Sequence, residues 1–113
     1  MGYLSSVKLL FIESPVYSEQ IDGLLSGEDH RQLQLYILEQ PERGDLIRGS
    51  GGLRKLRWAG SGRGKRGGIR VVYYLWRGDT VFMLFAYPKN KQVDLTPSQA
   101  RLLRDLIEAY TNG

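Results

Sequence analysis

The chain has no cysteine and a single histidine, His30, among its 113 residues. The lack of cysteine excludes disulfide bonds and thiolate metal sites. A single histidine excludes a zinc site built on several histidines, and it also excludes a ribonuclease mechanism that uses a histidine pair. The sequence therefore predicts a protein that works without a bound metal and without any other cofactor.

Long apolar runs are also missing. No stretch approaches the roughly 20 apolar residues of a membrane-spanning helix. Residues 1–6 lack the basic and apolar regions of a signal peptide. We therefore expect a cytoplasmic protein with no membrane partner, folded as a single domain over residues 1–113.

Acidic residues are absent from the middle of the chain. Residues 46–78 carry nine basic side chains and no acidic one, whereas residues 1–45 carry 3 basic and 8 acidic side chains. Residues 79–113 hold four of each sign, so the formal net charge is only +4. Positive charge concentrated in this way indicates a partner with dense negative charge, above all a phosphodiester backbone. The nine cations are Arg48, Arg54, Lys55, Arg57, Arg63, Lys65, Arg66, Arg70 and Arg77.

The first part of the chain predicts one strand and two helices. Residues 7–13 are apolar with a β-branched residue near each end, which favours a strand. Ser14 followed by Pro15 is typical of a helix start. A second helix is expected over residues 28–40, where Pro41 ends it.

The rest of the chain predicts three strands and a helix. The strands are expected over residues 53–58, 69–76 and 80–87, and the last two form a hairpin. Residues 96–99 (TPSQ) have the pattern of a capping box before a final helix. This order predicts an α+β fold with a mostly antiparallel sheet, two N-terminal helices and one C-terminal helix, all packed on one face of the sheet.

Alternation of side chains along a strand places Lys55 and Arg57 on one face and Arg54 on the other. Arg70 stands among apolar residues of the next strand, where a charge without a partner is costly to bury. It lies either at the mouth of a concave sheet or on an edge strand, where charges guard against aggregation. Both alternatives are open for Arg70 alone, but guarding an edge does not require nine cations.

A glycine-rich loop, residues 59–68, separates these two strands. Its glycines let backbone N–H groups approach an anion, and Arg63, Lys65 and Arg66 add positive charge. The loop lacks the Lys-Ser/Thr ending of nucleotide-binding phosphate loops. It is either an RNA-binding segment or a solvated hairpin tip.

Four stretches together resemble the HigB-type toxins of the RelE superfamily: residues 51–57 (GGLRKLR), 64–74 (GKRGGIRVVYY), 87–90 (YPKN) and 94–96 (DLT). The resemblance implies the microbial-ribonuclease-like fold of these type II toxin–antitoxin toxins. It also implies cleavage of messenger RNA in the ribosomal A site. Finally, it implies a cognate antitoxin, expected to be a helix-turn-helix DNA-binding protein, that neutralises the toxin by direct binding.

The resemblance also implies roles for single residues. Lys55 and Arg57 match the basic pair before the loop, Arg70 matches the strand arginine that contacts the scissile phosphate, and Lys89 matches a basic position after the last strand. The arginine and tyrosine that follow this strand in the best-studied RelE toxins are missing here, and Tyr87 or Tyr74 is the candidate substitute. The residues expected to bind messenger or ribosomal RNA are Arg54, Arg63, Lys65, Arg66, Tyr74 and Lys91.

These residue types support metal-independent cleavage in which the 2′-hydroxyl of the RNA attacks the adjacent phosphate. Arginine binds phosphate oxygens bidentately, so we assign Arg57 and Arg70 to charge stabilisation. Lys55 is assigned to proton transfer, because neighbouring cations favour the neutral form of a lysine. A site without histidines needs its substrate held ready for attack, and a ribosome can supply that orientation.

Two other functions stay open at this point. A gyrase-targeting toxin of the same superfamily should lack the basic trio Lys55, Arg57 and Arg70. A non-catalytic RNA- or ribosome-binding module would carry the same cations, so the sequence alone does not separate it from a nuclease.

Overall fold

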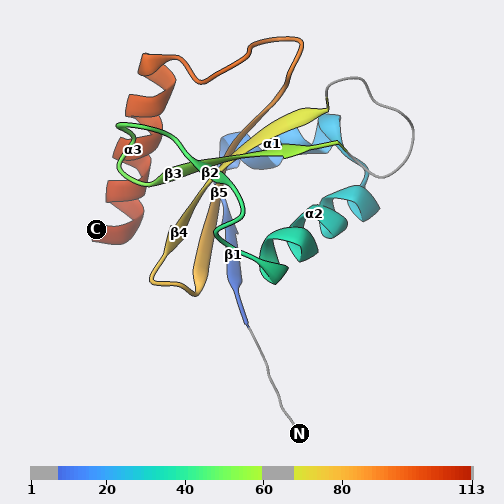
Figure 1. The fold of residues 1–113 in the computed structure, drawn as a ribbon, viewed down its shortest axis with the longest axis horizontal. Helices are drawn as coiled ribbons and strands as arrows, with labels where there is room; N and C mark the ends of the chain where they lie inside the picture. The colour runs from blue at the N-terminus through green and yellow to red at the C-terminus, as the bar shows by residue number, and fades with distance from the viewer. Residues whose placement is uncertain (1–7, 60–67, 113) are drawn as a thin grey trace, which may run out of the picture.

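The computed structural model describes residues 8–59 and 68–112, which form an α+β fold as predicted (Figure 1). The strands are β1 (Leu10–Glu13), β2 (Asp45–Leu46), β3 (Leu53–Trp58), β4 (Ile69–Trp76) and β5 (Thr80–Pro88). The helices are α1 (Pro15–Leu24), α2 (Gly27–Glu39) and α3 (Pro97–Asn112). Only β2 was not predicted, because two residues are too few to show a strand period.

The five strands form one sheet in the order β1-β5-β4-β3-β2. Only β1 is parallel to its neighbour, and the other three pairings are antiparallel, which confirms the mostly antiparallel sheet. The hairpin between β4 and β5 is confirmed as well. Its turn contains Arg77 and Gly78 at φ 59° and 76°, the left-handed region that tight hairpin turns use.

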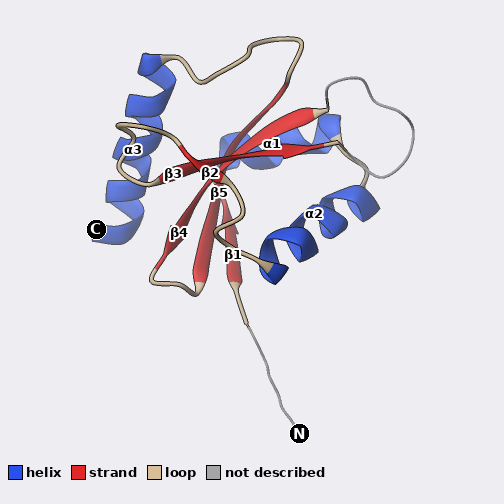
Figure 2. Ribbon diagram, viewed as in Figure 1, coloured by secondary structure: helices blue, strands red, loops and turns tan. Residues whose placement is uncertain are grey.

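The helices cover both faces of the sheet, so the prediction of a single covered face was wrong. Helices α1 and α2 pack against one face and α3 packs against the other (Figures 1 and 2). The reason lies in the central strands: Val71 and Tyr73 point to one face and Val72 to the other, and all three are fully buried. Because both sets of alternating side chains are apolar, each face needs a helix to cover it.

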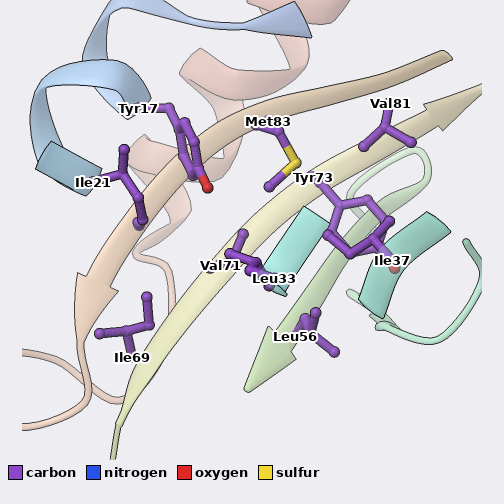
Figure 3. Packing of buried hydrophobic residues seen from close by; sticks show 11 residues of the cluster. Tyr17, Ile21, Leu33, Ile37, Leu56, Ile69, Val71, Tyr73, Val81 and Met83 are labelled. Carbon is purple, nitrogen blue, oxygen red and sulfur yellow. The ribbon is translucent and has the colours of Figure 1, made fainter. Parts of the chain in front are cut away.

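The core under α1 and α2 is the larger of the two. Tyr17 and Ile21 of α1 and Leu33 and Ile37 of α2 meet the sheet there (Figure 3). The sheet residues that face them are Leu56, Ile69, Val71, Tyr73, Val81, Met83 and Ala86. This core leaves the opposite face of β3 and β4 available to the basic side chains.

The opposite core is formed by α3. Leu103 and Ile107 of this helix pack against Leu53, Val72 and Phe82. The predicted capping box fixes where α3 begins. The backbone N–H of Gln99 donates to the Thr96 hydroxyl at 3.1 Å, and the backbone N–H of Thr96 donates to the side-chain oxygen of Gln99 at 3.0 Å. This start places the first turn of α3 beside the basic residues of β3.

Candidate functional site

Three of the predicted catalytic residues form one row across the sheet. Arg57 on β3 is the direct partner of Arg70 on β4, and Arg70 is the direct partner of Tyr87 on β5. Directly paired residues point to the same face of a sheet. We call Arg57 and Arg70 the basic row. It lies on the α3 face, and β4 has neighbours on both sides, which rules out the edge-strand alternative for Arg70.

Tyr87 reaches this face because of an irregularity in β5. The register between β4 and β5 shifts between Val72 and Tyr73, so that Leu84 and Phe85 both lie on the α3 face. A bulge of this kind adds one residue and reverses the alternation that follows it. Without the bulge, Tyr87 would point into the core under α1 and α2.

Lys55 lies beside the row, two residues before Arg57 and on the same face of β3, as predicted. Its ammonium group forms an ion pair with the carboxylate of Asp94, which comes from the segment between β5 and α3. The Lys55 side chain is 29% exposed and that of Asp94 is 65% exposed, so the pair lies at the surface. In the free protein Lys55 therefore already binds an anion, the carboxylate of Asp94.

The Tyr87 side chain is almost fully buried, with 3% of its surface exposed. Its hydroxyl donates a hydrogen bond to the backbone carbonyl of Val93 at 3.3 Å. Burial raises the pKa of this hydroxyl above its usual value, Lys55 and Arg70 lower the pKa, and Asp94 raises it. The Tyr87 hydroxyl therefore stays protonated and acts in this structure as a hydrogen-bond donor.

Lys89 and Lys91 lie in the turn after β5, with exposed side chains. The Lys89 amide donates to the carbonyl of Gly68 at 3.2 Å, and the Lys91 amide donates to the carbonyl of Pro88 at 3.0 Å. These bonds hold the turn at the end of the sheet where Arg57 and Arg70 lie. The other predicted cations, Arg63, Lys65 and Arg66, lie outside the described residues.

Arg54 does not join the other predicted residues. It lies on the opposite face of β3, where its guanidinium donates to the carbonyls of Gly44 at 2.7 Å and Glu42 at 3.0 Å. The Tyr73 hydroxyl bonds to the same turn, accepting from the Gly44 amide and donating to the carbonyl of Pro41. Arg54 therefore anchors the turn before β2 and lies on the other face of the sheet from Arg57 and Arg70, and its binding of RNA stays a prediction.

Tyr74 lies on the same face as Arg70 but at a distance along β4, opposite Leu53. It lines a separate hollow of about 470 Å³ with Trp76, Arg77 and Arg104. The structure therefore brings Tyr87, and not Tyr74, next to the basic row.

A second hollow of about 400 Å³ begins at Lys55 and extends to α3. Arg48, Arg101 and Arg104 line it, and none of the three is among the predicted site residues. The spacing of Arg101 and Arg104, three residues apart on one helix face, was the available signal. Nothing in the sequence showed that this face lies beside Lys55.

The part of the chain that the structure describes contains no group of three or more histidine, aspartate or glutamate side chains placed to hold a metal ion. None of the helices in residues 8–59 and 68–112 has the length and the hydropathy needed to cross a lipid bilayer.

Comparison with known proteins gives two findings. Residues 39–112 match the model of a family described as the RelE toxin of the RelE/RelB toxin–antitoxin system. The fold is similar to a solved structure of the E. coli toxin RelE, an arginine-to-alanine double mutant in the free state. The two chains are 17% identical, the match covers 85% of this chain and 97% of that chain, and the TM-score is 0.59. The family match includes the basic row, the Lys55–Asp94 pair and the hollow beside α3.

Proposed function

The chain belongs to the RelE toxin family of toxin–antitoxin systems, and from this premise we propose that it is an endoribonuclease that cuts messenger RNA in the ribosomal A site. We also propose that it belongs to the HigB-type subgroup, which the resemblance of four sequence stretches supports. Action on ribosomes implies a cytoplasmic protein, and a cognate antitoxin would silence it by direct binding. The observation that carries the proposal is the row of Arg57, Arg70 and Tyr87 beside Lys55 on one face of the sheet.

The proposed reaction is transesterification by the RNA itself. The 2′-hydroxyl oxygen bonds to the adjacent phosphorus while the bond from phosphorus to the 5′-oxygen breaks, which leaves a 2′,3′-cyclic phosphate and a 5′-hydroxyl. Arg57 and Arg70 bind the non-bridging oxygens, on which negative charge accumulates in the transition state. Two arginines on neighbouring strands provide these donors without any metal.

Two protons must move in this reaction. We assign the proton of the 2′-hydroxyl to Lys55, which accepts it as a neutral amine after RNA has displaced Asp94 and the ammonium group has given up one proton to water. Tyr87 is assigned to the leaving 5′-oxygen, because burial keeps its hydroxyl protonated. The lack of a histidine pair makes this a slow catalyst on free RNA, so a ribosome that presents the message in an attack-ready shape is part of the proposal.

The experiment compares Arg57→Ala and Arg70→Ala with Arg31→Ala, which removes one charge from the exposed surface of α2. Each protein is incubated with naked messenger RNA and with a programmed ribosome complex, and the RNA ends are mapped. We expect the two site variants to lose on the order of a hundredfold or more in cleavage rate, because each loses a donor to the transition state. Arg31→Ala should cut like the wild type, and circular dichroism should show all variants folded.

Three results would contradict parts of the proposal. Equal cutting of naked and ribosome-bound RNA by the wild type would remove the ribosome dependence. Full activity of Arg70→Ala would remove Arg70 from the site. Ribosome binding by the wild type without any cleavage would favour the non-catalytic binding module.

A further inference from the structure

The hollow beside α3 is bounded by the segment before β3, by Lys55, by the segment before α3 and by α3 itself. We call it the α3 groove, defined by Arg48, Lys55, Asp94, Arg101 and Arg104, with apolar residues such as Ile47 and Leu95 between them. It adjoins the basic row, because Lys55 lines the groove and lies two residues before Arg57 on the same face of β3. An RNA strand bound at Arg57 and Arg70 can therefore continue into it.

The charges of the α3 groove are not balanced. Four cations line it against one carboxylate, and that carboxylate is bound by Lys55. Arg48 and Arg101 are exposed, and neither forms an ion pair or a hydrogen bond through its side chain among the described residues. Two guanidinium groups thus face the groove with their donors available to an anion.

The positions of these arginines are fixed by the fold. Arg101 and Arg104 are three residues apart, so their Cβ atoms lie about 5–6 Å apart on one face of α3. Arg104 donates to the carbonyl of Gly49 at 3.3 Å, which ties α3 to the turn that carries Arg48. Within that turn, the Ser50 hydroxyl donates to the carbonyl of Ile47 at 2.6 Å. Arg48 and Arg101 therefore flank the groove from two ordered elements.

We propose that the α3 groove is a second phosphate-binding subsite, in which Arg48 and Arg101 hold the RNA backbone one or more nucleotides away from the bond that is cut. The proposal rests on the proposed nuclease function for its choice of RNA. The groove is continuous with the basic row and has apolar residues between its cations. This mixture suits an RNA strand, whose phosphates bind cations and whose bases and riboses pack against apolar side chains. An acidic peptide would match the cations but gives no reason for this continuity.

The experiment measures the affinity for a short single-stranded RNA in which every 2′-hydroxyl is methylated, so that it cannot be cut. The test variant is Arg48→Gln with Arg101→Gln, and Arg104 is left intact because it also holds the turn. The control is Lys8→Gln with Arg31→Gln, which removes two exposed charges far along the chain from the groove. Fluorescence anisotropy is recorded across a salt series, and polyglutamate is used as a second probe.

We expect the groove variant to bind RNA at least about tenfold more weakly, and the slope of log affinity against log salt to fall by about 0.7 for each phosphate that the variant no longer binds. The control should keep the wild-type slope. Arg101→Glu alone should weaken binding more than Arg101→Gln alone, because it adds repulsion. All variants should have the circular dichroism spectrum of the wild type, since the substituted side chains are exposed.

An equal loss of RNA affinity in the groove variant and the control would overturn the proposal, because the effect would then be one of net charge. Loss of polyglutamate binding with unchanged RNA binding would also overturn it, and would assign the groove to an acidic peptide. Cleavage of programmed ribosomes by the wild type is measured in parallel. If the wild type shows the expected binding but cuts nothing, the nuclease function fails while the subsite stands.

Discussion

At the scale of single residues, Tyr73 and Tyr87 are a natural pair for comparison. Both are buried, and burial raises the pKa of both hydroxyls. They lie on opposite faces of the sheet, however, and only Tyr87 is beside the basic row. The Tyr73 hydroxyl makes two backbone bonds, accepting from the Gly44 amide at 2.9 Å and donating to the Pro41 carbonyl at 2.7 Å.

We expect Tyr87→Phe to slow cleavage of ribosome-bound message by about tenfold to a hundredfold, because it removes the proposed proton donor. Tyr73→Phe is the matched control: it should leave the cleavage rate per folded molecule unchanged and lower the free energy of unfolding by about 2 kcal/mol, since it removes two hydrogen bonds. Single-turnover cleavage and urea denaturation measure the two effects. Cleavage by Tyr87→Phe at the wild-type rate would show that Tyr87 transfers no proton.

At the scale of elements, the turn before β3 is the segment on which both the fold and the α3 groove depend. Gly49, Gly51 and Gly52 all have positive φ, and Gly52 at 115° lies furthest from the conformations of other residues. A Cβ atom on Gly52 would lie 2.9 Å from Cε1 of Tyr74, whereas a Cβ on Gly49 would have no atom within 4 Å. A side chain at position 49 therefore has space around it, whereas one at position 52 collides with Tyr74.

We expect Gly52→Ala to lower the free energy of unfolding by about 2–3 kcal/mol, because it combines backbone strain with a collision against the Tyr74 ring. Gly49→Ala should cost only about 1 kcal/mol, because strain is its only penalty. Urea denaturation of both variants tests the order. A larger loss of stability for Gly49→Ala than for Gly52→Ala would show that the Tyr74 ring moves aside without cost.

At the scale of the whole molecule, three buried tyrosines link stability to alkaline pH. Burial raises the pKa of Tyr17, Tyr73 and Tyr87 above 10.0, and the Glu13 carboxylate adds to the effect at Tyr17. Above that pH the unfolded chain loses these protons while the folded chain keeps them. The contribution of these three groups to the free energy of unfolding is therefore fully present below pH about 10, and it is lost as the pH rises further.

The urea midpoint should accordingly be lower at pH about 11 than at pH about 8. Tyr87→Phe should reduce this difference, because one of the three groups no longer titrates. The measurement is urea denaturation of both proteins at the two pH values. A midpoint that stays constant or rises with pH would contradict the linkage.

Much of this molecule follows from local sequence. The strand and helix periods, the capping box at residues 96–99 and the hairpin turn are set by neighbouring residues, so they were predicted and are confirmed. The shared face of Lys55 and Arg57 follows from strand alternation in the same way. The four sequence stretches also indicated the RelE toxin superfamily, and the family match confirms it.

The tertiary structure decided the rest, because it depends on contacts between distant parts of the chain. Asp94 lies 39 residues along the chain from Lys55, to which it binds. Arg48 and Arg101 are also distant in sequence, and the packing of α3 places both of them along the α3 groove. Strict alternation would have turned Tyr87 away from Arg70, and a bulge in β5 reversed it. A sequence shows the period of each element, but the register of a sheet, the covering of its two faces and the neighbours of each side chain are fixed only when the elements pack together.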